Sequence, residues 1–289
     1  MNQSSPIASS LSGMSSLASQ HYENFPVGSF FLPSSIRRPI HLIYAFARVA
    51  DDIADEGNLP EAARIQQLDV WESSLLRAIA GESVDAFFNE LAGVISHHSL
   101  TTVYFRDLIT AFRMDARSTQ YRTFEDLLFY CRHSANPIGR LLLELFGGVT
   151  EESLAASDAL CTALQLTNFW QDLSVDTQRE RLYIPMEDLE RFGCAHMQSG
   201  PELRSLVEFQ VRRTRDIFGT GRALIASAPR TLRFETTLTW HGGMRILEKI
   251  ESQNYDSMQQ RPTLSLGDKF LIFARAAKSM IQMFLLEKD

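Results

Sequence analysis

Cysteine and long apolar runs are both scarce in this 289-residue chain. The three cysteines, Cys131, Cys161 and Cys194, are odd in number and form no CxxC pair, so we expect neither a disulfide framework nor a structural zinc site. No run of about 18 apolar residues occurs, which argues against a transmembrane span. Strand-like alternation of apolar and polar residues is also absent. These absences favour a helical protein of the reducing cytoplasm.

Positive charge is in short supply as well. The chain has 28 Lys and Arg against 35 Asp and Glu, and its net charge of -7 argues against a nucleic-acid partner, because backbone phosphates need a basic face. Residues 1–20 are rich in serine and contain no Lys or Arg, so they lack the charged segments of secretory signals and transit peptides. We predict a disordered tail over 1–20 and one domain over 21–289.

Apolar residues recur with the helical period along most of the chain. Gly147 and Gly148 end one such pattern, and Thr150 begins the next. The predicted helices span approximately 38–56, 60–79, 83–97, 101–116, 123–131, 137–145, 151–176, 201–226, 232–253 and 265–286. We therefore predict an all-α fold, a single-domain helical bundle around a central hydrophobic cavity.

Two acid-bearing stretches carry the strongest chemical signal. Asp51 and Asp55 are four residues apart and share one helical face, and Asn168, Asp172 and Asp176 repeat that spacing on another. Like charges one turn apart repel each other, and a hard divalent cation that binds oxygen ligands would compensate them. Two such faces opposed predict a magnesium site that binds a phosphate or diphosphate.

Each stretch alone also fits an ordinary solvated helix. Apolar residues opposite the acids, among them Phe46 near the first stretch and Trp170 within the second, are what a surface helix would show. The pairing favours the metal site, because Arg48 lies on the first acidic face and Arg181 follows the second, as counter-charges for a diphosphate would.

Proline and glycine interrupt the helical pattern over residues 130–139. Pro137 removes a backbone donor and kinks or breaks a helix. A simple break between two helices is one interpretation. A kinked helix that presents Tyr130, Ser134 and Asn136 to the substrate is the other.

These residues resemble the head-to-head prenyl synthases, the family of squalene, phytoene and dehydrosqualene synthases. The resemblance runs from His21 to about Lys278. It rests on residues 21–33, on Tyr44-Ala-Phe-Ala-Arg48 with Asp51-Asp52-xx-Asp55, and on Gln165-xx-Asn168-xxx-Asp172-xxx-Asp176 followed by Arg181-x-Tyr183-x-Pro185. It implies the isoprenoid-synthase type of helical bundle.

The amino-acid sequence of residues 21–26 and 134–139 most resembles that of one bacterial branch, the hydroxysqualene synthases of hopanoid biosynthesis. This implies conversion of presqualene diphosphate and water to hydroxysqualene and diphosphate, with magnesium and without NADPH. Two alternatives stay open: an enzyme that condenses two farnesyl diphosphates to presqualene diphosphate, squalene or dehydrosqualene, and a non-catalytic assembly factor with the same fold. Glu23, Asn24 and Gln171 make the chain less basic than carotenoid-type members, which suits one bound diphosphate better than two.

The resemblance also implies roles for individual residues. The implied magnesium ligands are Asp51, Asp55, Asn168, Asp172 and Asp176. The implied catalytic residues are Asp51, Asp55, Tyr44, Arg48, Tyr130 and Asn136. Substrate or diphosphate would contact His21, Asn24, Phe25, Tyr44, Arg48, Gln165, Asn168, Arg181 and Tyr255, with Arg261 and Lys269 as weaker candidates. Aromatic faces would stabilise a carbocation, although each of these rings also suits ordinary core packing.

Location and partners are expected from the same resemblance. We expect a cytoplasmic protein that associates peripherally with the inner membrane surface because its substrate is a lipid. Residues 269–286 are apolar but interrupted by Arg275, Lys278 and Gln282, which predicts a packed terminal helix rather than a membrane anchor. Presqualene diphosphate synthase and hydroxysqualene dehydroxylase would be the partners for hand-over of substrate and product.

Overall fold

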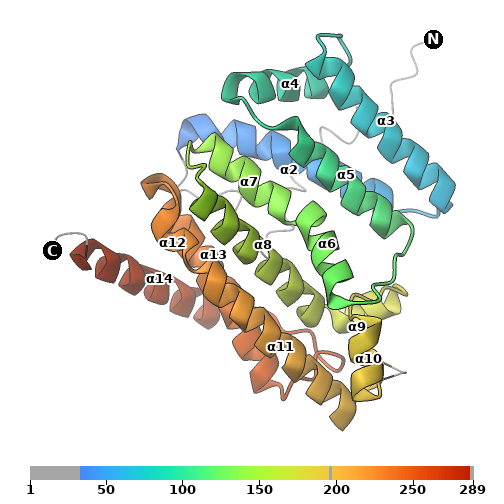
Figure 1. Ribbon diagram of the computed structural model, residues 1–289, viewed down its shortest axis with the longest axis vertical. Helices are drawn as coiled ribbons and strands as arrows, with labels where there is room; N and C mark the ends of the chain where they lie inside the picture. The colour runs from blue at the N-terminus through green and yellow to red at the C-terminus, as the bar shows by residue number, and fades with distance from the viewer. Residues whose placement is uncertain (1–32, 195–196, 287–289) are drawn as a thin grey trace.

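The computed structural model describes residues 33–194 and 197–286, and this part of the chain contains helices and no strands. The predicted all-α fold is confirmed (Figure 1). In chain order the helices are α2 (Ser34–Asp55), α3 (Glu61–Ile79), α4 (Ala86–His98), α5 (Thr102–Ala116), α6 (Phe124–Ser134), α7 (Asn136–Leu145), α8 (Glu151–Gln171), α9 (Leu173–Gln178), α10 (Met186–Phe192), α11 (Pro201–Gly221), α12 (Leu224–Ser227), α13 (Arg230–Ser252) and α14 (Leu266–Leu286).

Local sequence sets several of these boundaries. The Thr150 hydroxyl accepts a hydrogen bond from the backbone N–H of Ser153, and the Ser153 hydroxyl lies 2.8 Å from the backbone nitrogen of Thr150, which closes a capping box at the start of α8. Thr123 and Asp126 form the same motif at the start of α6. Such a cap satisfies backbone donors that the first helical turn leaves without partners.

The interrupted segment is a break between two helices. Ala135 separates α6 from α7 with φ −104° and ψ −44°, and Pro137 stands in the first turn of α7, where a missing N–H costs nothing. Asn136 is buried, and its side-chain oxygen accepts a hydrogen bond of 3.0 Å from the Thr162 hydroxyl of α8. Asn136 therefore ties α7 to α8.

The long predicted helix over 151–176 is divided. α8 ends at Gln171, and Asp172 leaves helical geometry with φ −99° and ψ 13° before α9 begins. The backbone N–H of Asp172 still donates to the Asn168 carbonyl, and that of Asp176 to the Asp172 carbonyl, both at 2.8 Å. The three predicted ligands thus remain stacked one turn apart across the break.

α8 is the central element of the bundle and packs against α6, α7, α11, α12 and α13 (Figure 1). Close packing with α11 depends on Gly221, because a Cβ there would lie 2.7 Å from the backbone nitrogen of Leu160. Only glycine permits this approach without displacing backbone.

Buried apolar side chains form two clusters. The α8 cluster gathers α6, α8, α11 and α13 around fully buried rings such as Trp170 and Phe218. The α2 cluster gathers α2 to α5 around Phe46, Trp71 and Phe105. The ring centroid of Phe46 lies 5.7 Å from that of Trp71 and 5.4 Å from that of Phe105. Each such side chain contributes about 2 to 3 kcal/mol by leaving water. α7 contributes buried leucines to both clusters.

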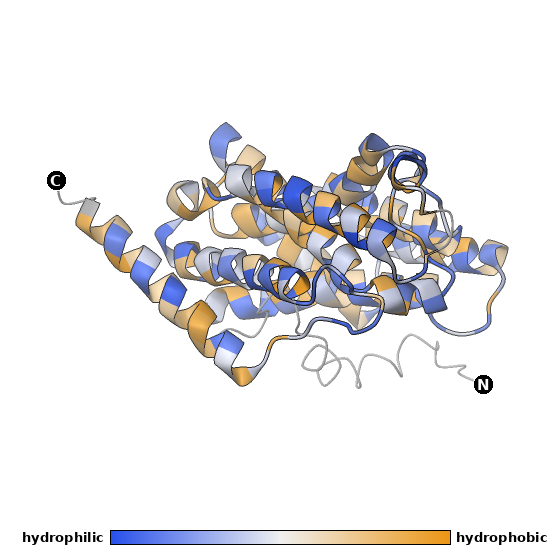
Figure 2. Cartoon of the chain, turned by 90° about the horizontal axis from the view of Figure 1, so that it is seen from below, coloured by the Kyte–Doolittle hydropathy of each residue, from blue (hydrophilic) through white to orange (hydrophobic). Residues whose placement is uncertain are grey.

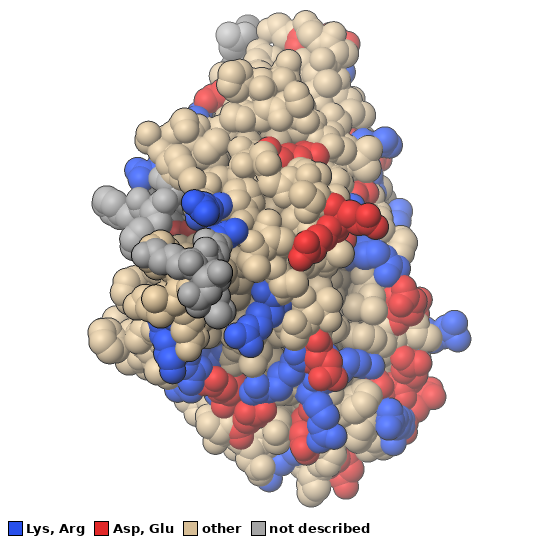
Figure 3. All heavy atoms as spheres, turned by 60° about the vertical axis from the view of Figure 1, so that its left-hand side comes forward, with Lys and Arg blue, Asp and Glu red and all other residues tan. Residues whose placement is uncertain are grey.

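The surface shows no separated basic region on the face drawn in Figure 3. Basic and acidic side chains intermingle over its lower part, and much of its upper part is uncharged. α14 runs along the outside of the bundle, and its last turns lead away from the body (Figures 1 and 2). Within the described residues, no helix combines the length and hydrophobicity needed to cross a bilayer.

Candidate active site

An ion pair joins the two acid-bearing stretches across 126 residues of sequence. The two terminal nitrogens of Arg181, which follows α9, donate to the two carboxylate oxygens of Asp55 at the end of α2, one of them at 2.8 Å. Both side chains are largely buried, and the carboxylate raises the already high pKa of Arg181 against the opposing effect of burial. The fold therefore brings the two predicted motifs together.

Arg48 is held by acids of its own helix. Its guanidinium lies 2.9 Å from a carboxylate oxygen of Asp51 and 2.6 Å from one of Asp52. Burial raises the pKa of Asp51 to about 7, and the neighbouring charge of Asp55 adds to this effect. The predicted position of Arg48 on the acidic face is confirmed, and its charge now offsets the repulsion between these carboxylates.

The second acidic stretch is paired with the segment that precedes α14. The Nε of Arg261 donates to one carboxylate oxygen of Asp172, and a terminal nitrogen lies 3.4 Å from the other. Burial raises the pKa of Asp176 to about 7, and the charge of Asp172 adds to this effect. Arg261, which the sequence offered as a weaker candidate for contact with the diphosphate, is therefore paired with Asp172, a predicted magnesium ligand.

A further carboxylate, Asp115 at the end of α5, lies beside the acidic motifs. It accepts hydrogen bonds from the hydroxyls of Tyr130 at 2.9 Å and Tyr183 at 3.2 Å. Burial raises the pKa of Asp115 to about 7; the Tyr130 hydrogen bond opposes this, and the charge of Asp55 reinforces it. Sequence reasoning missed Asp115, although an acid in the last turn of a helix opposes the helix dipole and was a usable signal.

Four aromatic rings pack beside Asp115. Tyr183 stacks on Phe169 with ring centroids 3.9 Å apart, and Tyr130 lies 5.8 Å from Tyr183 and 5.6 Å from Tyr121. Tyr130 is only 5% exposed, so its ring packs mainly against other rings. This packing favours a core position for the ring of Tyr130 over a position facing the substrate, and its hydroxyl donates a hydrogen bond to Asp115.

Three other residues singled out from the sequence are Tyr255, Lys269 and Gln171. Tyr255 follows α13, where partial burial raises its pKa and the neighbouring acids Glu251 and Glu208 add to this effect. Lys269 is exposed on α14. Gln171 is buried and donates a hydrogen bond of 2.7 Å to the Pro262 carbonyl, so it anchors a loop instead of facing an anion.

Three of the remaining candidates lie on described helices. Gln165 and Asn168 are half-buried on neighbouring turns of α8, and Tyr44 packs at the edge of the α2 cluster. The predicted substrate residues His21, Asn24 and Phe25 lie outside the described residues, as does Glu23.

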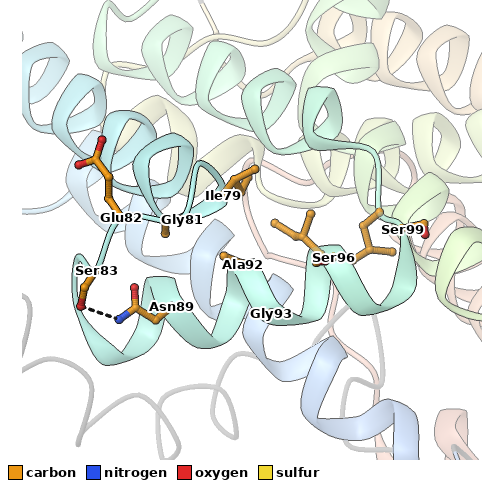
Figure 4. Close-up of a pocket in the computed structure, with 12 residues that line it drawn as sticks. Ile79, Gly81, Glu82, Ser83, Asn89, Ala92, Gly93, Ser96 and Ser99 are labelled. Atoms are coloured by element: carbon orange, nitrogen blue, oxygen red, sulfur yellow. Dashed lines mark hydrogen bonds between the residues drawn. The ribbon is translucent and has the colours of Figure 1, made fainter.

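The described residues line at least two hollows. A small one of about 30 Å³ is lined by Asp115, Arg181 and Tyr183 with neighbouring loop residues, so it belongs to the acidic site. A larger one of about 700 Å³ lies between the end of α3 and the length of α4 (Figure 4). Glu82 is the one charged residue that lines it and is paired with Arg77, so this hollow carries no converging catalytic groups.

The donor set of the acidic site suits a hard cation. No three acidic, histidine or cysteine side chains in the described part of the chain already converge as a metal site. Asp51 and Asp55 nevertheless lie one helical turn apart, as do Asp172 and Asp176, so carboxylates crowd one another within each motif. Magnesium bound jointly by protein carboxylates and substrate phosphate needs only one or two ligands from each motif. The residues therefore fit magnesium.

Two acidic segments that meet beside arginines suit a diphosphate bound together with divalent cations. The model of the family Squalene/phytoene synthase matches residues 18–268. A hydroxysqualene synthase of Rhodopseudomonas palustris is 35% identical over 210 residues, which are 71% of this chain and 70% of that protein. A 15-cis-phytoene synthase of Synechococcus elongatus is 30% identical over 264 residues, or 85% of each.

The structural comparison agrees. The crystal structure of squalene synthase HpnC from Alicyclobacillus acidocaldarius superposes with a TM-score of 0.77 at 37% identity, covering 87% of this chain and 97% of that one. The chain belongs to the squalene/phytoene synthase family. The predicted family and its type of helical fold are thus confirmed.

Proposed function

We propose that this protein is a hydroxysqualene synthase that converts presqualene diphosphate and water to hydroxysqualene and diphosphate. The observation that carries the diphosphate chemistry is the Arg181–Asp55 bridge, which assembles both acidic motifs into one site. The similarity to the hydroxysqualene synthase of Rhodopseudomonas palustris supports the choice of branch.

The proposed reaction balances without a reductant. The carbon–oxygen bond of presqualene diphosphate breaks and its electron pair leaves with the diphosphate. The cyclopropylcarbinyl cation rearranges, the oxygen of water bonds to it, and one proton is released. Because water and not hydride quenches the cation, no NADPH is required.

The charged residues have a direct task in this scheme. Asp51, Asp55, Asn168, Asp172 and Asp176 are the proposed magnesium ligands, and bound magnesium would neutralise charge on the diphosphate. Arg181 and Arg261 contact two of those carboxylates, and we propose that their guanidiniums supply positive charge to the leaving diphosphate. Arg48 supplies a third positive charge beside Asp51.

The other assigned roles are also part of the proposal. Gln165 and Tyr44 are proposed to contact the substrate, together with His21, Asn24, Phe25 and Tyr255. Tyr130 and Asn136 are retained as catalytic candidates, and their contacts with Asp115 and Thr162 suggest that they act by positioning.

A second candidate is an enzyme that condenses two prenyl diphosphates. The similarity to the phytoene synthase of Synechococcus elongatus covers more of the chain than that to the hydroxysqualene synthase, and this favours keeping it. A non-catalytic assembly factor is the remote alternative. A buried set of paired aspartates and arginines costs stability and serves no purpose in a scaffold.

The test is incubation of the purified protein with magnesium and either presqualene diphosphate or farnesyl diphosphate, without NADPH, followed by mass analysis of the lipids. We expect hydroxysqualene from presqualene diphosphate alone. Presqualene diphosphate formed from farnesyl diphosphate would establish the condensing enzyme instead. An Asp55→Asn variant is the inactive control. Magnesium with pyrophosphate should raise the melting temperature of an intact site, and a scaffold would show no such rise.

Partners follow from the chemistry of substrate and product. The substrate must come from an enzyme that joins two farnesyl units, and the alcohol product must be consumed by a dehydroxylating enzyme. We propose direct hand-over with both enzymes, presqualene diphosphate synthase and hydroxysqualene dehydroxylase, in the cytoplasm at the inner membrane surface.

A further inference from the structure

The terminal helix α14 has one face that is fixed to the bundle. Asp268 is 4% exposed and lies 2.9 Å from the ammonium of Lys249 on α13. One turn and two turns later Ile272 and Ala276 are buried, and Ser279 lies 3.1 Å from a ring nitrogen of His241. The helix is therefore docked on the bundle from Asp268 to Ser279, as a packed terminal helix is expected to be.

The opposite face of α14 is apolar and open. At about 100° per residue its exposed large side chains fall within an arc of about 120°, a stripe along the helix axis. They are 47% to 84% exposed, and we call them the α14 stripe: Leu266, Phe270, Phe273, Ile281, Phe284 and Leu285. A line of large apolar side chains with this much exposed surface is unusual for a soluble monomer and marks an interaction surface.

Lysines border the stripe on both sides. Lys269 and Lys278 are exposed and project about 90° to either side of its centre. Neither forms an ion pair within the described part of the chain, whereas Arg275 on the packed face is paired with Glu248 at 2.6 Å. An apolar stripe with lysines at its edges is the arrangement by which a helix lies in a lipid surface with its ammonium groups at the phosphates.

The stripe begins next to the candidate active site. Arg261 holds Asp172 and the Pro262 carbonyl receives the Gln171 amide, and α14 starts four residues later at Leu266. A surface on which the stripe docks would therefore lie close to the residues that contact the diphosphate.

We propose that the α14 stripe docks the protein on a bilayer that contains anionic lipids. The inference rests on the proposed function only for the lipid nature of substrate and product, which partition into a bilayer. A second copy of the chain is a poorer occupant, because pairing through the same stripe would bring the bordering lysines of both copies together.

The test is flotation of the full chain with vesicles of phosphatidylcholine alone or of phosphatidylcholine with phosphatidylglycerol. We expect the protein to float with the anionic vesicles. A double variant, Phe270→Glu with Ile281→Glu, should lower the bound fraction at least about tenfold. Replacing Lys278 by Gln should weaken binding roughly fivefold.

Matched controls place a new carboxylate on other exposed apolar positions. Val70→Glu on α3 and Val103→Glu on α5 replace side chains that are each 53% exposed, and they should float like the unaltered protein. All variants should keep the melting-temperature rise with magnesium and pyrophosphate. This readout separates a lost surface from a damaged site.

Three results would overturn the proposal. The unaltered protein could stay in the aqueous fraction with both kinds of vesicle. The stripe variant could float as well as the unaltered protein. A dimer in solution that the stripe variant converts to monomer, without vesicle binding, would assign the stripe to a second copy. None of these depends on which prenyl diphosphate the enzyme uses.

Discussion

The most informative perturbation outside the active site is Glu235→Gln on α13. Glu235 is 3% exposed, and neither carboxylate oxygen has a hydrogen-bond partner among the residues that the structure describes. Burial alone raises its pKa from 4.5 to about 7. The substitution keeps the shape of the side chain and removes its titration.

The sign and size of the effect follow from linkage. Between pH 4.5 and about 7 the folded protein keeps a proton on Glu235 that the unfolded chain has released. The stabilisation from this proton is complete below the unfolded pKa and is lost as the pH rises through the folded pKa. A shift of about 2.5 units corresponds to roughly 3 kcal/mol as an upper value. The Gln variant should gain that amount relative to the unaltered protein as the pH rises.

The assay is urea denaturation, followed by far-ultraviolet circular dichroism, of both proteins from about pH 5 to about pH 8. We expect the difference in free energy of unfolding to change steadily in favour of the Gln variant. Glu152→Gln, at an exposed position in the first turn of α8, is the control and should show a difference that stays within about 0.5 kcal/mol. If the Glu235 difference is equally flat, the carboxylate is solvated or paired and the reasoning is wrong.

Two further predictions concern packing and the site. Gly221→Ala should lower the free energy of unfolding by about 1 to 3 kcal/mol in urea denaturation, because the new Cβ would lie 2.7 Å from the Leu160 backbone nitrogen. Gly219→Ala, whose Cβ meets nothing within 4 Å, should be neutral or stabilising, and equal losses would refute the argument. Arg181→Lys should lower turnover of presqualene diphosphate by about a hundredfold or more, since lysine cannot form the two-fold contact with Asp55. Unchanged turnover in a folded variant would contradict this role.

Helical periodicity was sufficient to predict the fold class and most helix positions, because each helix buries one apolar face. It could not predict the break at Asp172, since the acid spacing of four residues continues across it. It also left the segment around Ala135 open between a kink and a break. The hydrogen bond of Thr162 to Asn136 is a tertiary contact that no local pattern reveals.

The part of the candidate site that depends on residue spacing within each acidic motif was predictable from the sequence. The meeting of the two acidic motifs was predicted, but the ion pair between Arg181 and Asp55 was not, since Arg181 was predicted to contact the diphosphate. Asp115 was missed because its environment is created by tyrosines from α6 and from the segment after α9. Gln171 was interpreted from its lack of charge, whereas its burial against the Pro262 carbonyl decides its role. Partners brought from distant segments are not encoded in residue spacing.

The two hydrophobic clusters place the halves of the site on separate packing units. Asp55 ends a helix of the α2 cluster, and Asp172 follows a helix of the α8 cluster. A diphosphate gripped from both sides would act as a cross-link between these units, in addition to the Arg181–Asp55 pair. Saturating ligand should then slow amide hydrogen exchange across the whole of α2, including turns far from the acids, because separation of the clusters is the motion it prevents.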